Sequence, residues 1–113
     1  MKNIENLVCR IIKKYKTYSA FEICSKMAIR VMLMDLPDDV KGFYVKFLKN
    51  RVIIINNSIP LKDMECVCAH ELGHIFLHEN VNSIKIENES KFDVSIFEKE
   101  AEYFSRCFLK ASN

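Results

Sequence analysis

The chain has 113 residues, half of them hydrophobic, with only two glycines and two prolines. This length and composition predict one small packed domain over residues 1–113 and exclude a disordered chain. The formal net charge is +2, divided into +6 over residues 1–60 and −4 over residues 61–113. Because no basic cluster is interleaved with aromatic residues, we expect no direct contact with nucleic acid.

The cysteines and the apolar runs indicate the compartment. The five cysteines are odd in number and contain no C-x-x-C pair. No apolar run of the signal-peptide type stands at the N-terminus, and runs such as Val52–Ile55 are too short to cross a membrane. We therefore expect reduced thiols in a cytoplasmic protein with no membrane partner.

The first thirty residues predict two helices. Apolar residues recur at helical spacing over residues 4–15, and Asn3 is a candidate N-cap. A second helix is expected to begin at Ser19, because Ser19 and Glu22 have the spacing of a capping box.

The pattern then changes to that of strands. A first strand is expected over residues 29–33, followed by strands over residues 42–48 and 51–56. Lys49–Asn50 would join the last two as a hairpin, with Asn50 at a positive φ. Val52–Ile55 has no polar face, so it should be an inner strand covered on both sides. An antiparallel sheet of about three strands is the simplest arrangement.

Two more helices complete the predicted α+β fold. One should run over residues 60–79, with Ser58 as its cap and Pro60 in its first turn. Residues 80–94 are polar, with one short strand expected near residues 84–86. The last helix, over residues 95–111, carries one apolar stripe that includes Ala101, Phe104 and Phe108.

The helix predicted over residues 60–79 contains the motif H-E-x-x-H, at His70, Glu71 and His74. Residues four apart share one helix face, so both imidazoles can reach one metal ion. Glu71 can then act as general base toward a water at that ion. This pattern predicts a zinc site, although another divalent metal can use the same ligands.

A catalytic zinc usually takes three protein ligands. His78 is too far along an intact helix, since eight residues rise about 12 Å. The metzincin turn is also absent, because Leu77 and Asn80 replace the glycine and histidine that it needs. His78 is instead a candidate for a supporting contact around the ligands, for the cleft rim, or for a cation near the helix C-terminus.

The acidic last helix is the expected source of the third ligand. Helical periodicity leaves Glu98, Glu100 and Glu102 open as candidates, and Glu98 could also belong to a capping box. Cys66 lies one turn before His70, so a Cys-His-His set is conceivable. We interpret both Cys66 and Cys68 as core residues of the motif helix.

The motifs together resemble the ImmA/IrrE family of metallo-endopeptidases from phages and mobile elements. The resemblance lies in the run from Ala69 to His74, in Leu77 and His78, and in the last helix, and it extends to the hairpin upstream. It implies a zincin-like fold and a third zinc ligand at Glu98, with Ala101 and Phe104 at the family's alanine and phenylalanine positions. Glu102 departs from the usual Asn or Asp, but from there it could hydrogen-bond a ligand histidine.

The resemblance also implies a function. We expect a zinc-dependent endopeptidase that cleaves a helix-turn-helix transcriptional repressor of a mobile element, with Tyr44 and Tyr103 as candidates for stabilising the oxyanion. The alternative is an antirepressor that keeps its metal and sequesters a regulator without cutting it, which the short C-terminus would favour. A third possibility is an interaction domain stabilised by zinc.

Overall fold

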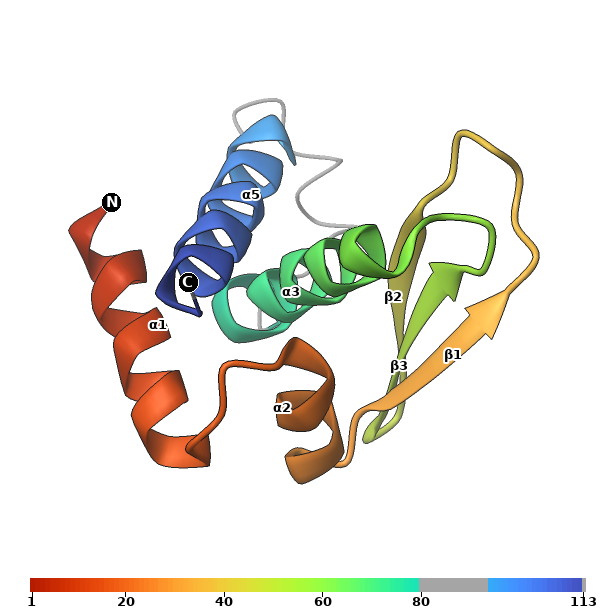
Figure 1. The fold of residues 1–113 in the computed structure, drawn as a ribbon. Helices are drawn as coiled ribbons and strands as arrows, with labels where there is room; N and C mark the ends of the chain where they lie inside the picture. The colour runs from red at the N-terminus through yellow and green to blue at the C-terminus, as the bar shows by residue number, and fades with distance from the viewer. Residues whose placement is uncertain (80–93, 113) are drawn as a thin grey trace.

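The computed structural model describes residues 1–79 and 94–112. Along the chain, the described helices and strands are α1 (Lys2–Tyr15), α2 (Ala20–Lys26), β1 (Arg30–Met34), β2 (Gly42–Phe47), β3 (Asn50–Asn56), α3 (Leu61–His78) and α5 (Val94–Ala111). The predicted α+β class is confirmed, whereas the strand expected near residues 84–86 lies outside the described residues. Figure 1 shows α3 in the middle of the molecule, with the sheet on one side and α5 and α1 on the other.

The sheet has three strands, as predicted, but it is mixed rather than antiparallel. Its order is β1-β3-β2. β2 and β3 form the expected antiparallel hairpin, whereas β1 pairs with β3 in parallel. Residues 35–41 carry the chain across the end of the sheet, so β3 enters between the other two strands. This order gives the central position to the most apolar strand, which is where burial stabilises it most.

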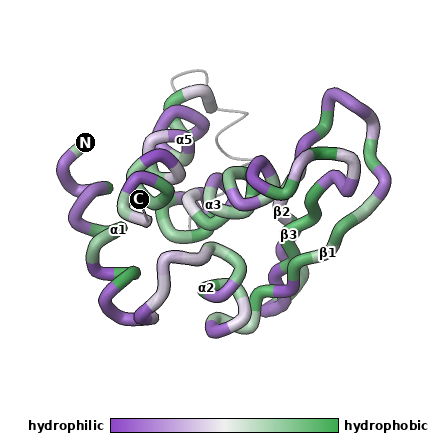
Figure 2. The backbone as a smooth tube through the Cα atoms, in the orientation of Figure 1, coloured by the Kyte–Doolittle hydropathy of each residue, from purple (hydrophilic) through white to green (hydrophobic). Residues whose placement is uncertain are grey.

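Only one face of β3 is fully covered by the described helices. Ile53 and Ile55 are fully buried in the core. Ile54 is half-buried on the opposite face, where its paired neighbours Met32 and Phe43 are 37% and 39% exposed. The expectation that Val52–Ile55 would be covered on both sides is therefore wrong for the described residues. Figure 2 shows hydrophobic stretches along α3 and the strands.

The predicted caps and turns are partly confirmed. Ser19 caps α2, because its side chain accepts a hydrogen bond from the Glu22 N–H. The hairpin turn differs from the prediction, since Leu48 has the positive φ of 58° and Asn50 is already paired in β3. Ser58 does not cap α3, whose N-cap is Pro60. The Ser58 hydroxyl instead donates to Asn56 Oδ1 at 2.7 Å.

Both glycines of the chain lie where α3 approaches another element closely. A Cβ added at Gly42 in β2 would meet Val67 Cγ1 of α3 at 2.5 Å. A Cβ added at Gly73 in α3 would meet Ala101 and Phe104 of α5 at 3.1–3.2 Å. These contacts bring one edge of the sheet and α5 against the same helix. Among the described helices, none is long and apolar enough to span a lipid bilayer.

Candidate metal centre

The two motif histidines lie on one face of α3, as their spacing predicts. The ring centroids of His70 and His74 are 5.0 Å apart, and both side chains are largely but not fully buried. Burial lowers the pKa of His74, with the neighbouring His70 and His78 acting in the same direction and Glu98 opposing them. The lowered pKa favours the neutral imidazole, which is the form that binds metals.

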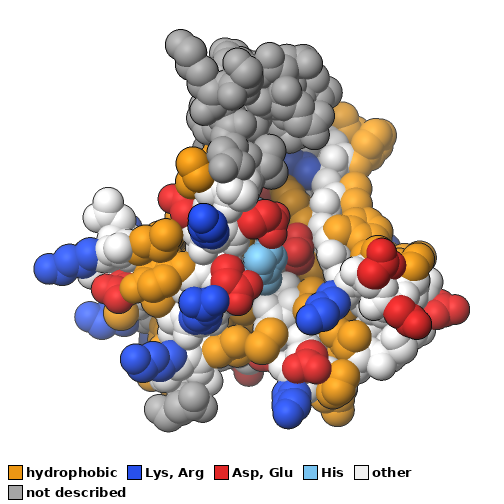
Figure 3. Space-filling view, turned by 90° about the horizontal axis from the view of Figure 1, so that it is seen from above, with side chains coloured by type: hydrophobic (Ala, Val, Ile, Leu, Met, Phe, Trp, Pro, Cys, Tyr) orange, Lys and Arg blue, Asp and Glu red, His pale blue; other side chains and the backbone are white. Residues whose placement is uncertain are grey.

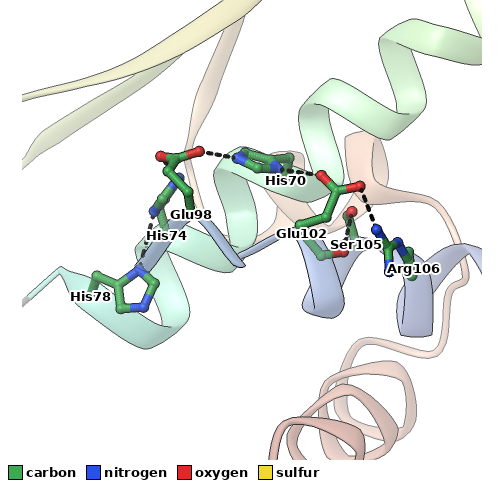
Figure 4. Close-up of polar contacts among 7 residues, drawn as sticks. All are labelled: His70, His74, His78, Glu98, Glu102, Ser105 and Arg106. Atoms are coloured by element: carbon green, nitrogen blue, oxygen red, sulfur yellow. Dashed lines mark hydrogen bonds and ion pairs between the residues drawn. The ribbon is translucent and has the colours of Figure 1, made fainter. Parts of the chain in front are cut away.

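Glu98 of α5 faces both histidines (Figure 4). Its Oε2 lies 3.1 Å from His70 Nε2, and its Oε1 lies 2.9 Å from His74 Nε2. Two imidazole nitrogens and one carboxylate thus converge on a single point. This set of two nitrogens and one oxygen is a donor set that catalytic zinc sites use.

The packing of α5 on α3 determines this convergence. Ala101 is fully buried against Gly73, which lies between the two histidines in the sequence. Phe104 is also fully buried and stacks with Phe76, at a centroid separation of 6.0 Å. Because neither Gly73 nor Ala101 has a bulky side chain, the two helices approach closely enough for a glutamate to reach both imidazoles.

Glu71 completes the cluster of donor atoms. Ligand atoms of His70, Glu71 and His74 all lie within 4.8 Å of one another. Burial raises the pKa of Glu71 from 4.5 to about 7, with the nearby Glu98 raising it further and His70 opposing this. A carboxyl with a pKa near neutral pH can both accept and return a proton, which a general base in hydrolysis must do.

The three candidate carboxylates of α5 have different neighbours. Glu98 faces the two Nε2 atoms, whereas Glu102 lies 3.5 Å from His70 Nδ1, on the other side of that ring, and pairs with Arg106. Glu100 contacts the third histidine, with its Oε1 3.0 Å from His78 Nε2. Periodicity alone left these three residues open, and their contacts separate them. Glu102 and His78 therefore lie around the histidines, where the sequence suggested supporting contacts.

Neither Cys66 nor Cys68 belongs to the donor cluster. Cys68 is fully buried, with its Sγ 3.6 Å from that of Cys24 in α2. Cys66 is exposed overall, but partial desolvation of its thiol, together with nearby acidic residues, raises the pKa of the thiol and so disfavours the thiolate that binds zinc. Our interpretation of Cys68 as a core residue is confirmed, but for Cys66 it is wrong.

The histidines open into a cleft of about 760 Å³ between α3, α5 and β2. Gly42, Phe43 and Tyr44 of β2 line one side of the cleft, and Glu98 and Glu102 of α5 line the other. Figure 3 shows a histidine side chain at the surface of this face, bordered by acidic side chains. The cleft is large enough for several residues of a peptide.

The two candidate tyrosines lie in different places. Tyr44 lines the cleft, and its hydroxyl donates to Glu79 Oε2 at 2.7 Å. Glu79 also pairs with Arg51 and Lys46, so it ties the end of α3 to the hairpin. Tyr103 donates instead to Glu5 of α1, at 2.5 Å, and is not among the residues that line this cleft. No sequence motif pointed to Glu79, which directly follows the last residue of α3.

The fold and the site together define a class of protein. The chain has an H-E-x-x-H helix that packs on a small sheet, and a second helix brings a carboxylate to it. This is the architecture of a zincin-like metallopeptidase domain. Residues 24–110 match the model of the IrrE N-terminal-like domain, peptidase family M78. The chain therefore belongs to this family, and the resemblance found in its motifs is confirmed.

Two curated relatives are similar over most of the chain. The "Uncharacterized immunity region protein 2" of Bacillus phage phi105 is 36% identical over 102 residues, which are 90% of this chain and 65% of that protein. The metallopeptidase ImmA of Bacillus subtilis strain 168 is 34% identical over 104 residues, 92% of this chain and 61% of that protein. The chain thus spans less than two thirds of the length of each of these relatives.

Proposed function

We propose that this protein is a zinc-dependent endopeptidase of the cytoplasm that cleaves a helix-turn-helix repressor of a phage or mobile element. The observation that carries the proposal is the convergence of His70 Nε2, His74 Nε2 and the Glu98 carboxylate, with Glu71 beside them. The repressor is suggested by the family resemblance and by the relative from a phage immunity region. The five free cysteines fit a reducing compartment.

In this proposal His70, His74 and Glu98 are the metal ligands. When bound, zinc polarises the scissile carbonyl and makes a water molecule at the site more acidic. Because only one of these three ligands is charged, the site would keep half of the positive charge of a divalent ion for this effect. Glu102 and His78 contact the ring edges of the ligand histidines that face away from Glu98, so they hold these rings in place.

Glu71 moves the proton in the proposed hydrolysis. Its carboxylate accepts a proton from the attacking water and then delivers it to the nitrogen of the leaving amine. The cleft presents β2 to the substrate, and in the described sheet β2 pairs only with β3. Its other edge can therefore hydrogen-bond an extended peptide, which would place the scissile bond above the histidines.

The test is incubation of a purified helix-turn-helix repressor from the phage or mobile element with the zinc-loaded protein and, separately, with its Glu71→Gln variant. We expect the parent to produce two fragments, whose new ends mass spectrometry identifies, and the variant to produce none at equal zinc content. Glutamine has the shape of glutamate but cannot take the proton. If the variant relieves repression as well as the parent does, the protein is an antirepressor that acts by binding, and the proposal is wrong.

A further inference from the structure

The third histidine of the chain lies between a proposed ligand and a carboxylate. His78 Nδ1 is 3.1 Å from His74 Nδ1, and His78 Nε2 is 3.0 Å from Glu100 Oε1. The His78 side chain is 10% exposed, and its ring lies 4.3 Å from that of Phe97. The H-E-x-x-H motif includes neither His78 nor Glu100, and the proposed function gives His78 only a contact with the His74 ring. The row of His74, His78 and Glu100 therefore needs its own explanation.

The hydrogen bonds along the row have one consistent direction. An ionised carboxylate only accepts, so His78 must donate from Nε2 to Glu100. A neutral imidazole with its proton on Nε2 has a lone pair on Nδ1, so His78 accepts there. His74 must then donate from its own Nδ1. The proton of His74 is thereby held on the side of the ring opposite Glu98.

We propose that Glu100 and His78 form a positioning relay that fixes His74 in the tautomer with a free Nε2, ready to bind the metal. The inference rests on the metal site of the proposed function. The competing tautomer would carry its proton on Nε2, where it would donate to Glu98 Oε1 at 2.9 Å and block that nitrogen from a metal ion. It would leave the Nδ1 atoms of His74 and His78 facing each other as two acceptors, which is repulsive. The relay therefore favours the form of His74 that accepts a cation.

Two simpler roles for His78 are a direct metal ligand and a packing residue. The geometry is inconsistent with the first, and a separate variant tests the second. His78 is not a direct ligand, because it contacts Nδ1 of His74 while Glu98 lies at Nε2. A packing role against Phe97 would be kept by a leucine, which fills similar space without hydrogen bonds. His78→Leu thus separates packing from the relay, and His78→Gln restores an acceptor oxygen for His74.

The experiment measures zinc affinity of the purified full chain by competition with a chelator. Replacing a partner that supports a metal ligand typically weakens binding about 10–100-fold. We expect this loss for His78→Leu and for Glu100→Ala, and a smaller loss for His78→Gln. Glu98→Ala, which removes a proposed ligand, sets the scale for a damaged site. Glu22→Gln, an exposed carboxylate on α2, is the matched control and should bind zinc like the parent.

The double variant His78→Leu with Glu100→Ala gives the sharpest result. Glu100 acts only through His78 in the relay, so the double variant should bind zinc no more weakly than His78→Leu alone. Long-range ¹⁵N NMR of the zinc-free parent should show His74 protonated at Nδ1, and this proton position should be lost in His78→Leu. Additive losses, or parental affinity in both single variants, would overturn the relay while leaving the proposed metal site intact. If the parent binds no zinc but is folded, the proposed function itself fails, and the relay fails with it.

Discussion

Glu71 should make the metal-free protein less stable, although the proposed hydrolysis depends on it. Burial raises its pKa from 4.5 to about 7. Each unit of pKa shift corresponds to about 1.4 kcal/mol, so the ionised carboxylate destabilises the fold by on the order of 3 kcal/mol at most. Glutamine has nearly the same shape and no charge. We therefore expect Glu71→Gln to raise the stability of the metal-free protein at neutral and higher pH.

The pH dependence follows from the direction of this shift. Below the unfolded-state value of about 4.5, Glu71 is protonated in both states and the two proteins should be equally stable. As the pH rises from 4.5 to 7, the unfolded chain releases its proton while the folded protein retains it, so the parent loses stability. Above pH 7 the difference between parent and variant should stay constant.

Urea unfolding of chelator-treated protein between pH 5 and pH 8 measures this difference. A change of about 1 kcal/mol moves Tm by roughly 4–8 °C in a domain of this size, so thermal scans will also detect it. Glu22→Gln serves as the control and should show no pH-dependent gain, because Glu22 is exposed. If Glu71→Gln has the same or lower stability than the parent at pH 8, Glu71 is not a strained buried carboxyl.

Two further predictions concern packing and polar burial. Gly73→Ala gains about 1 kcal/mol of helix propensity but meets Ala101 and Phe104 at 3.1–3.2 Å, which costs about 1–3 kcal/mol. The alanine variant should therefore bind zinc more weakly while its unfolding free energy changes little. Gly73→Val should lower both the zinc affinity and the unfolding free energy, and parental zinc affinity in the valine variant would contradict this. Asn56 is fully buried, with its Nδ2 donating to carbonyls of the β1–β2 connection. Asn56→Ala should lower the unfolding free energy by about 2–4 kcal/mol, and Asn56→Asp should lower it by more. Thermal unfolding of the two variants measures this, and an unchanged Tm in both would contradict the prediction.

The residues that could be predicted from sequence are those whose placement depends on local geometry. His70, Glu71 and His74 share a helix face because the helical repeat alone brings residues four apart together. The hairpin of β2 and β3 is equally local, since its two strands adjoin in sequence. The parallel pairing of β1 was not predictable in this way. It depends on where residues 35–41 take the chain, and Asn56 fixes that path through contacts distant in sequence.

The choice among Glu98, Glu100 and Glu102 illustrates the same limit. Glu98 and Glu102 lie about 40° apart around the axis of α5 and Glu100 lies about 200° from Glu98, so the rotation of the helix decides which carboxylate faces the motif histidines. The rotation is determined by contacts between helices and not by the sequence of α5 alone. The Tyr44–Glu79 bond was missed for a related reason, because it joins residues 35 apart that belong to no shared motif.

The contact between Gly73 and Ala101 explains why the two motifs work as one unit. Ala101 packs on Gly73, which directly precedes His74 in the sequence. Glu98 lies three residues before Ala101, on nearly the same helix face and one turn toward the N-terminus of α5. This register brings Glu98 to both Nε2 atoms, while Glu102 reaches His70 Nδ1 and Glu100 reaches His78. A larger residue at either small position would move all three carboxylates together, so the small residues position the site as much as its charged residues do.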